Sequence, residues 1–478
     1  APHTDADTDD GEVRTVVLEL SAPEDPAPVR SGIGIVLGSG DESYLLRVDA
    51  AGIHCRARTP EGVFRAASAA VQMIADGSEL QHQEIHDAPA YAWRGLMVDP
   101  ARHFLTPEDL RRIIDLAALY KLNVLHLHLT DNEGWRLEVP GLPELTAGGG
   151  PFYTTEEYRA LQDYAAARYV TVIPEIDLPG HCGALRAAFP DLPPAPIPDK
   201  TARTLEALGM AQHFTAPLDL ADSRTADLVS RIFAHVCAAT DAPFVHIGAD
   251  EAAGMTHDSY AGAVRFLRET VRAAGKEPIG WQEHSRAGIA PGDLAQFWVD
   301  PSMTGPATLE ASGVPADFAA AVSAFFAPTA DDLARIVAGR GKVLLSPQSH
   351  LYLDRPHDAA LVAPHQAEAA ARLGMPVYEP RGIRQLAAWD PTGHQVPTEQ
   401  IAGIEAAVWA ESITCFDDLT LLLLPRLPAV AEVAWSGTPS DWDEYRERLG
   451  RHARLWTQRG LTYAASTEVD WEPTEPTT

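Results

Sequence analysis

Short apolar runs alternate with longer stretches of helical periodicity over most of the chain, beginning near residue 91. Eight runs have the length and composition of buried strands: 95–98, 124–129, 170–176, 244–247, 278–281, 294–298, 342–345 and 404–409. Helical patterns lie between most of these runs or follow the last one: 107–120, 155–168, 225–239, 260–274, 330–338 and 419–434. This alternation predicts an α/β fold built on a parallel (β/α)8 TIM barrel.

Two stretches fit the barrel less well. Gly, Pro and Ala crowd the segment between 298 and 342, which we interpret as an insertion. The link between the fifth and sixth strands is too short for a full helix. A doubly wound open sheet also alternates strands with helices, but it usually has fewer strands. We therefore expect the barrel and keep the open sheet as the alternative.

The region ahead of the barrel predicts a small α+β domain over 13–88. Its strand-like runs are separated by Pro, Gly and Asp, and Thr59 and Pro60 are placed to start a helix over 60–74. The barrel domain is then expected over 89–465. Acidic, Pro/Thr-rich segments at 1–12 and 466–478 are predicted to be disordered tails. The predicted strands of the small domain are 13–20, 34–37, 44–48 and 53–58.

Each predicted barrel strand carries a carboxylate, a histidine or a tryptophan at or just after its C-terminal end, where barrels carry their sites. In strand order these residues are Asp99, Arg102 and His103; Asp131, Asn132 and Trp135; Glu175, Asp177 and His181; Asp250 and Glu251; Trp281; Trp298; Tyr352 and Asp354; Trp409 and Glu411. Aromatic faces stack on the C–H surfaces of sugars, and carboxylates accept hydrogen bonds from hydroxyls. The ring of residues therefore predicts a sugar-binding site.

The sharpest local feature is the adjacent acid pair Asp250-Glu251 in the segment HIGADE. Two neighbouring carboxylates at the end of a buried strand repel each other, which drives their pKa values apart and lets one serve as an acid while the other stays ionised. The alternative is a helix N-cap with acidic residues in its first turn. The polar and aromatic residues at the other seven strand ends favour the catalytic interpretation.

Composition and charge exclude several classes of protein. Apolar residues make up 46%, as in an ordinary globular protein, and the formal net charge is −30. We expect no nucleic-acid partner, because no basic cluster offsets that charge, and no membrane partner, because the longest apolar run is too short to span a bilayer. The four cysteines lack zinc spacing, so buried thiols or one or two disulfides are expected, with no metal and no cofactor.

Seven motifs, in order, give the chain a resemblance to glycoside hydrolase family 20, the β-N-acetylhexosaminidases, from about residue 13 to about residue 460. They are YAWRGLMVDPARHF at 91–104, LHLHLTDNEGW at 125–135, PEIDLPGH at 174–181, HIGADE at 246–251, YLD at 352–354, VWAES at 408–412 and PRLPAVAEVAWS at 425–436. The small N-terminal domain is similar to the α+β domain that precedes the barrel in this family.

The resemblance implies an exo-acting, retaining glycosidase that removes terminal β-linked N-acetylglucosamine or N-acetylgalactosamine. The 2-acetamido group of the substrate is the nucleophile, and an oxazolinium intermediate forms. Glu251 matches the general acid and base, and Asp250 matches the residue that orients the acetamido N–H. Tyr352 matches the hydroxyl that donates to the acetamido oxygen.

The substrate-binding residues implied by the resemblance come from seven strand ends. Arg102 is the candidate for binding the ring hydroxyls, with Arg94 as its rival. Trp281, Trp298 and Trp409 match the walls of the acetamido pocket. Asp354 and Glu411 match further sugar-binding groups. Asp131 and His181 match a relay that tunes Glu251.

The remaining polar and aromatic motif residues are interpreted as structural. We expect Glu175 and Asp177 to brace the loop that carries His181. The tryptophans and histidines assigned to packing or to the core are Trp93, Trp135, Trp389, Trp435, His126, His128 and His246.

One residue departs from the family pattern, in which a glycine precedes the acid pair. The chain has Ala249 there, and we expect it at negative φ with activity retained. Ala249 also supports the alternative of a catalytically silent amino-sugar-binding protein. A disaccharide-releasing or modified-sugar-selective family member is the other alternative, and the segment 300–330 is expected to shape subsites or contact a partner.

The expected partner is an oligosaccharide or glycoconjugate with a terminal N-acetylhexosamine. The acidic N-terminal segment, the even number of cysteines and a polymeric substrate together favour secretion, with a cytoplasmic location as the alternative.

Overall fold

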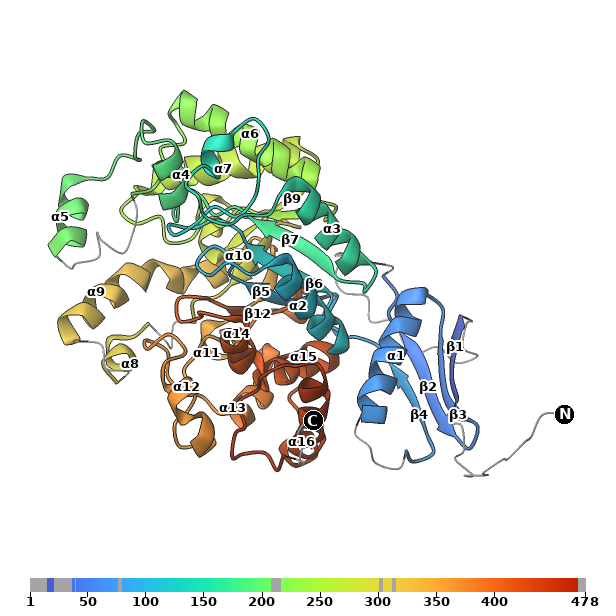
Figure 1. Cartoon of the computed structure of the whole chain (residues 1–478). Helices are drawn as coiled ribbons and strands as arrows, with labels where there is room; N and C mark the ends of the chain where they lie inside the picture. Colours follow the sequence, from blue (N-terminus) through green and yellow to red (C-terminus); the bar gives the residue numbers. More distant parts are fainter. Residues whose placement is uncertain are drawn as a thin grey trace. The chain divides into compact units, whose positions relative to one another are not determined.

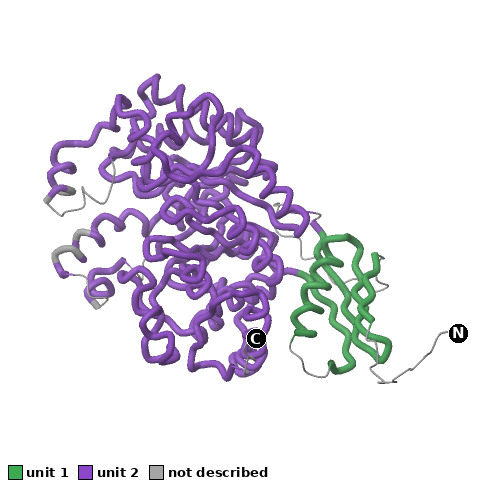
Figure 2. The backbone as a smooth tube through the Cα atoms, in the orientation of Figure 1, with its two compact units in different colours: residues 1–29, 41–88 green, residues 30–40, 89–478 purple. Residues whose placement is uncertain are grey.

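The structure, a computed structural model, describes residues 15–20, 37–38, 40–75, 80–207, 216–300, 304–311 and 315–471. The chain divides into two compact units: 1–29 with 41–88, and 30–40 with 89–478 (Figure 2). Leu37, expected in a strand of the small domain, belongs to the second unit and is buried in its core outside any strand. The rest of that predicted strand, 34–36, and the predicted tail 1–12 lie outside the described residues.

The described residues of the first unit form a four-stranded sheet and one helix. The strand order is β1-β3-β2-β4, with β1 parallel to β3 and the other pairs antiparallel. Helix α1 contacts β1, β2 and β3. Strand β4 was not predicted, because its sequence QEIHD offers one aliphatic side chain and no alternation. The bounds are β1 Thr15–Leu20, β2 Tyr44–Asp49, β3 Gly52–Ala57, β4 Gln83–Asp87 and α1 Pro60–Ala75.

The second unit is the predicted parallel barrel, closed in the order β5-β6-β7-β8-β9-β10-β11-β12. Figure 1 labels several of these strands, such as β5, β6, β7 and β12. Its strands are β5 Trp93–Val98, β6 Val124–His128, β7 Thr171–Glu175, β8 Phe244–His246, β9 Glu277–Trp281, β10 Leu294–Phe297, β11 Lys342–Leu345 and β12 Ile401–Val408. Almost every strand residue is buried, as expected for a parallel sheet covered by helices. The eight-stranded barrel is confirmed, and the open sheet is excluded.

Side-chain caps define where the main helices begin. Thr106 and Thr154 form capping boxes with Asp109 and Glu157, and Asp222 caps a third helix. The helices are α2 Pro107–Leu119, α3 Thr155–Ala166, α4 Gly183–Ala188, α5 Asp199–Ala207, α6 Ser223–Ala239, α7 His257–Ala273, α8 Pro306–Ala311, α9 Ala316–Phe326, α10 Asp332–Ala338, α11 Gln348–Leu351, α12 Ala367–Ala371, α13 Ile383–Ala387, α14 Phe416–Leu423, α15 Arg426–Ser436 and α16 Trp442–Gln458.

Two expectations about the C-terminal part were wrong. The predicted helix 419–434 is two helices, α14 and α15, because Pro425 interrupts the hydrogen-bond ladder between them. Residues 466–471, expected in a disordered tail, are packed: Val469 is buried, and the Trp471 ring lies 5.0 Å from Tyr463. Among the described residues, only α14 and α15 taken together, bent by 50°, have the length and composition of a membrane span; no single helix does.

The four cysteines are free thiols. Cys55, Cys182 and Cys237 are buried and Cys415 is exposed. Their even number therefore no longer argues for secretion.

Candidate active site

A cavity of about 360 Å³ opens at the C-terminal ends of the barrel strands. Nine of the eleven site residues expected from the sequence line it: Arg102, Asp131, His181, Asp250, Glu251, Trp298, Tyr352, Trp409 and Glu411. The other two, Trp281 and Asp354, are fully buried beside it. The rings of Trp298 and Trp409 lie 6.3 and 5.9 Å from Trp281, so Trp281 backs the cavity.

The acid pair sits on a sharp turn after β8. Gly248, Ala249 and Glu251 all have positive φ, at 67°, 76° and 41°. The Ala249 N–H donates to Asp177 Oδ1 at 3.1 Å, and a Cβ on Gly248 would collide with the same carboxylate. The expectation of negative φ at Ala249 was wrong, because the turn needs the left-handed region that glycine adopts without strain.

The acid pair is not a helix N-cap. The next helix, α7, begins at His257, and Thr256 is its cap. Both carboxylates instead line the cavity.

Burial raises the pKa of Asp250 to about 6, and the neighbouring Glu251 charge adds to the rise. Asp177 lies beside Asp250, and burial together with the Asp250 charge raises the pKa of Asp177 well above its ordinary value. Oxygen atoms of both carboxyls and a ring nitrogen of His181 all lie within 4.8 Å of one another. Asp177 therefore contributes to the acid pair itself, beyond bracing the His181 loop.

His181 connects the acid pair to the charges behind it. Its Nε2 lies 3.2 Å from Glu251 Oε2, and its Nδ1 lies 3.1 Å from Asp131 Oδ1. Burial lowers the pKa of His181, but the Asp131, Asp250 and Asp177 carboxylates raise it well above its ordinary value overall. His181 is therefore an imidazolium held against Glu251.

Aromatic rings form the opposite wall of the cavity. Tyr352 stacks parallel to Trp298 at 6.2 Å, and its ring lies 6.0 Å from Trp409. The indole of Trp298 donates to Glu283 Oε2 at 3.0 Å, which fixes its orientation. These rings with Trp281 enclose an apolar recess of the kind that an acetyl group fills.

Arg102 stands at the junction between the two walls. Its guanidinium pairs with Asp99 and Asp131 at 2.9 and 2.7 Å, lies 3.5 Å from Glu411 and sits over the Trp409 ring. Its rival Arg94 is fully buried near the start of β5, donates to backbone carbonyls and does not line the cavity. Arg102 is thus the arginine available to a ligand.

Two carboxyls near this junction have raised pKa values. Burial and the nearby Glu411 charge raise the pKa of Asp354 to about 8. Burial also raises the pKa of Glu411, while Arg102 opposes the rise.

Several cavity residues were not expected from the sequence. Tyr378, Met375 and Val377 come from the loop after α12, far from any strand end, and Gln348 comes from α11, three residues after β11. The insertion supplies Thr304, Leu309, Val322 and Phe326. The insertion therefore reaches the cavity, while its expected role in shaping subsites or contacting a partner stays a prediction.

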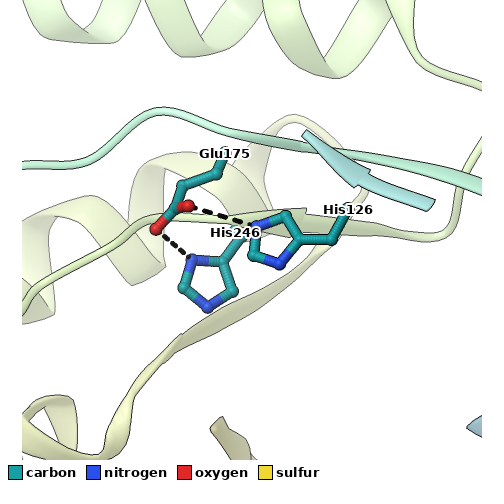
Figure 3. A group of neighbouring side chains, drawn as sticks. All are labelled: His126, Glu175 and His246. Atoms are coloured by element: carbon teal, nitrogen blue, oxygen red, sulfur yellow. Dashed lines mark ion pairs between the residues drawn. The ribbon is translucent and has the colours of Figure 1, made fainter. Parts of the chain in front are cut away.

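Three groups of histidine and carboxylate atoms in the described residues lie close enough together to hold a metal ion. The most buried group is His126, Glu175 and His246 (Figure 3). Glu175 already forms ion pairs with both rings there, at 3.2 and 2.9 Å. The other two groups share Glu175, Asp177, His181 and Asp250 with the networks described above.

Comparisons with known proteins agree with this geometry. The family profile "Glycosyl hydrolase family 20, catalytic domain" matches residues 91–438. A beta-N-acetylhexosaminidase of Cellulomonas fimi is 37% identical, covering 96% of this chain and 87% of the relative. A beta-hexosaminidase of Akkermansia muciniphila is 32% identical, covering 78% and 75%.

Solved structures give the same result. A glycoside hydrolase family 20 beta-N-acetylglucosaminidase superposes with a TM-score of 0.74 at 30% identity, covering 96% of this chain and 92% of that one. A mutant Streptomyces plicatus beta-hexosaminidase in complex with product GlcNAc gives 0.71 at 28%, covering 92% and 85%. The protein belongs to glycosyl hydrolase family 20.

Proposed function

We propose that the protein removes terminal β-linked N-acetylglucosamine or N-acetylgalactosamine from oligosaccharides or glycoconjugates, with retention of configuration and with the substrate's own acetamido group as nucleophile. The observation that carries this proposal is the acid pair Asp250-Glu251 facing a recess of aromatic rings across one cavity. That arrangement suits a sugar whose 2-substituent must be held under its anomeric carbon.

In the first step, the acetamido carbonyl oxygen attacks the anomeric carbon as the glycosidic C–O bond breaks. Glu251 gives its proton to the departing oxygen. Asp250, as a carboxylate, accepts a hydrogen bond from the acetamido N–H and stabilises the positive charge of the oxazolinium ring. His181 then stabilises the carboxylate that Glu251 has become, because its imidazolium lies 3.2 Å away.

The aromatic wall orients the nucleophile. Burial raises the pKa of Tyr352 well above its ordinary value, so its hydroxyl remains a proton donor toward the acetamido oxygen. Trp298 and Trp409 restrict rotation of the acetamido group, which keeps its oxygen near the reacting carbon.

In the second step, water adds to the anomeric carbon from the face that the leaving group has vacated. Glu251 accepts a proton from that water, the ring C–O bond to the acetamido oxygen breaks, and the acetamido group is restored. Two displacements at the same carbon return the original configuration.

The alternatives have weaker support. A silent sugar-binding protein is disfavoured, because the relatives that cover most of the chain are named as hexosaminidases. Exo-action on single sugars is favoured over disaccharide release, because the mutant Streptomyces plicatus beta-hexosaminidase holds GlcNAc, a single sugar, as its product. Secretion stays a prediction that rests on the acidic N-terminal segment and the expected substrate.

The test compares Glu251→Gln with the unaltered protein on a β-linked N-acetylglucosamine disaccharide and on its 4-nitrophenyl glycoside. We expect kcat for the disaccharide to fall by about 10²- to 10⁴-fold, the usual range for loss of a general acid. The nitrophenyl glycoside should lose less, because its leaving group needs little protonation.

Glu277→Gln is the matched control, since this exposed glutamate lies at the start of β9, the end away from the cavity. Unchanged disaccharide turnover by Glu251→Gln would remove the proposed acid.

A further inference from the structure

A line of buried ionisable groups continues from the active site into the barrel interior. Asp131 Oδ2 lies 3.0 Å from His128 Nε2, and His128 Nδ1 lies 2.6 Å from Glu175 Oε2. Beyond them, His126 Nδ1 lies 2.8 Å from Glu405 Oε1. With His181 and Glu251, acidic and imidazole groups alternate from the cavity to the middle of the barrel.

Glu175 is the branch point of this line. Its Oε2 pairs with His128 and, at 3.2 Å, with His126. Its Oε1 pairs with His246 at 2.9 Å (Figure 3). The same oxygen accepts a hydrogen bond from the Trp281 indole at 2.8 Å. One carboxylate therefore reaches the acid/base through His128 and the floor of the aromatic recess through Trp281. Glu175 itself is fully buried and does not line the cavity.

Each charged group along this line favours the ionised form of its neighbour. Although burial raises the pKa of Glu175, the His128 and His246 rings lower it well below its ordinary value overall. Burial lowers the pKa of His128, but Glu175 and Asp131 raise it well above its ordinary value. An ionised Glu175 therefore keeps His128 protonated, and a protonated His128 keeps Asp131 ionised beneath His181.

A purely stabilising role does not explain this cluster. Buried ion pairs lose most of their Coulombic gain to desolvation, so apolar residues of similar size serve stability as well or better. The same barrel shows that alternative in its core cluster, where Trp93, Val124, Ile173, Ile279 and Leu344 pack together. The buried ionisable groups instead lie toward the C-terminal ends of the barrel strands, next to the active site.

We propose that Glu175 is a positioning residue for catalysis. By holding His128 as an imidazolium, it fixes Asp131 and His181 against Glu251. By accepting a hydrogen bond from the Trp281 indole, it fixes the position of the aromatic recess. The inference rests on the proposed function and adds a residue that touches no substrate. The sequence interpretation of Glu175 as a brace and of His128 as structural is replaced by a role in the relay.

The test is Glu175→Gln, because glutamine keeps the volume and an oxygen that can accept from Trp281 but removes the charge that faces His128. We expect kcat/KM for the N-acetylglucosamine disaccharide to fall roughly 10- to 100-fold, as when one charge-assisted hydrogen bond is lost. The 2,4-dinitrophenyl glycoside should fall much less, because its leaving group needs no proton.

The pH profile gives a second readout. Removing one negative charge lowers the proton affinity of every group in the cluster, so the alkaline limb of kcat/KM should move to lower pH. The titratable or charged groups around the relay are Asp99, Arg102, His126, His128, Asp131, Asp177, His181, His246, Asp250, Glu251, Glu405 and Glu411.

Glu405→Gln is the matched control. Glu405 is equally buried and pairs with His126, but in the described contacts it touches neither His128 nor Trp281. We expect Glu405→Gln to lower the free energy of unfolding and to shift the alkaline limb of kcat/KM less than Glu175→Gln does. Equal losses on both substrates with an unmoved limb in Glu175→Gln would overturn the inference. No turnover of either substrate by the unaltered protein would instead overturn the proposed function.

A measurement on the unaltered chain covers the case in which Glu175→Gln does not fold. In protein labelled with ¹⁵N-histidine, the His128 resonances, assigned by their loss in His128→Gln, should report two protonated ring nitrogens at neutral pH. A neutral His128 ring would overturn the inference.

Discussion

The two halves of the barrel mouth are built from different chemistry. Strands β5 to β8 are followed by the charged groups Arg102, Asp131, His181 and the acid pair, whereas β9 to β12 end in or lead to Trp281, Trp298, Tyr352 and Trp409. The charged half is held by directional ion pairs of about 3 Å, such as His181–Glu251 at 3.2 Å. The aromatic half is held by ring packing near 6 Å and by the hydrogen bonds that the Trp281 and Trp298 indoles donate to buried glutamates.

This difference separates two tasks. Ion pairs at fixed distances set protonation states, so we expect changes in the charged half to alter kcat and pH dependence. The packed rings set the shape of the recess, so changes in the aromatic half should alter how firmly the acetamido group is held. Arg102 and Glu411 join the halves, because β12 pairs with β5 to close the barrel.

Among the further changes that test this comparison, the largest effect is expected from Asp250→Asn, in the charged half. The amide removes the negative charge that faces the developing oxazolinium, so kcat should fall by about 10²- to 10³-fold. The measurement is turnover of the 4-nitrophenyl glycoside, with the exposed Asp258→Asn as the control. A loss of less than tenfold would show that Asp250 does not carry charge stabilisation.

The pH dependence of the charged half comes next. Because the pKa of Asp250 is raised to about 6 and its carboxylate form is the one that accepts the acetamido N–H, kcat/KM should rise with pH up to about 6. Below that value the rate should change about tenfold per pH unit. A profile that is flat between pH 4.5 and 6 would contradict the assignment.

A single hydroxyl of the aromatic half gives a smaller effect. Tyr352→Phe keeps the ring that packs on Trp298 and Trp409 but removes the donor to the acetamido oxygen. We expect kcat/KM to fall about tenfold, as for one hydrogen bond, with the pH profile unmoved. A shifted pH profile would show that the two halves are not separable.

The smallest effect is expected at the turn beneath the acid pair. Ala249 has φ of 76°, so Ala249→Gly should raise the free energy of unfolding by roughly 1 kcal/mol. Thermal or denaturant unfolding measures this change, and kcat/KM should change less than tenfold. A gain of orders of magnitude in kcat/KM would show that the methyl group obstructs the sugar.

The sequence predicts the barrel well, because eight buried parallel strands need eight continuous apolar runs. It misses β4, whose polar sequence lacks such a run, and it joins α14 to α15 across Pro425. It also assigns residues 466–471 to a tail, since local composition does not reveal that Val469 and Trp471 pack on distant residues.

The residues of the candidate site likewise divide into those that the sequence predicts and those that it misses. Residues that directly follow a strand are predictable, because the barrel brings all strand ends together. Tyr378 and Phe326 enter from a loop and an insertion, which carry no periodic signal. Glu175 and His128 are visible in the sequence, but their partners lie on other strands, so only the structure reveals the network.

The central claim is that the substrate supplies its own nucleophile between these two halves. It is tested most directly by kcat/KM for aryl glycosides whose N-acetyl group carries zero, one, two or three fluorines. Because fluorine withdraws electrons from the carbonyl oxygen, the account predicts a steep fall with each added fluorine. Rates that stay nearly constant across the series would contradict it, since a protein carboxylate acting as nucleophile would not depend on that oxygen.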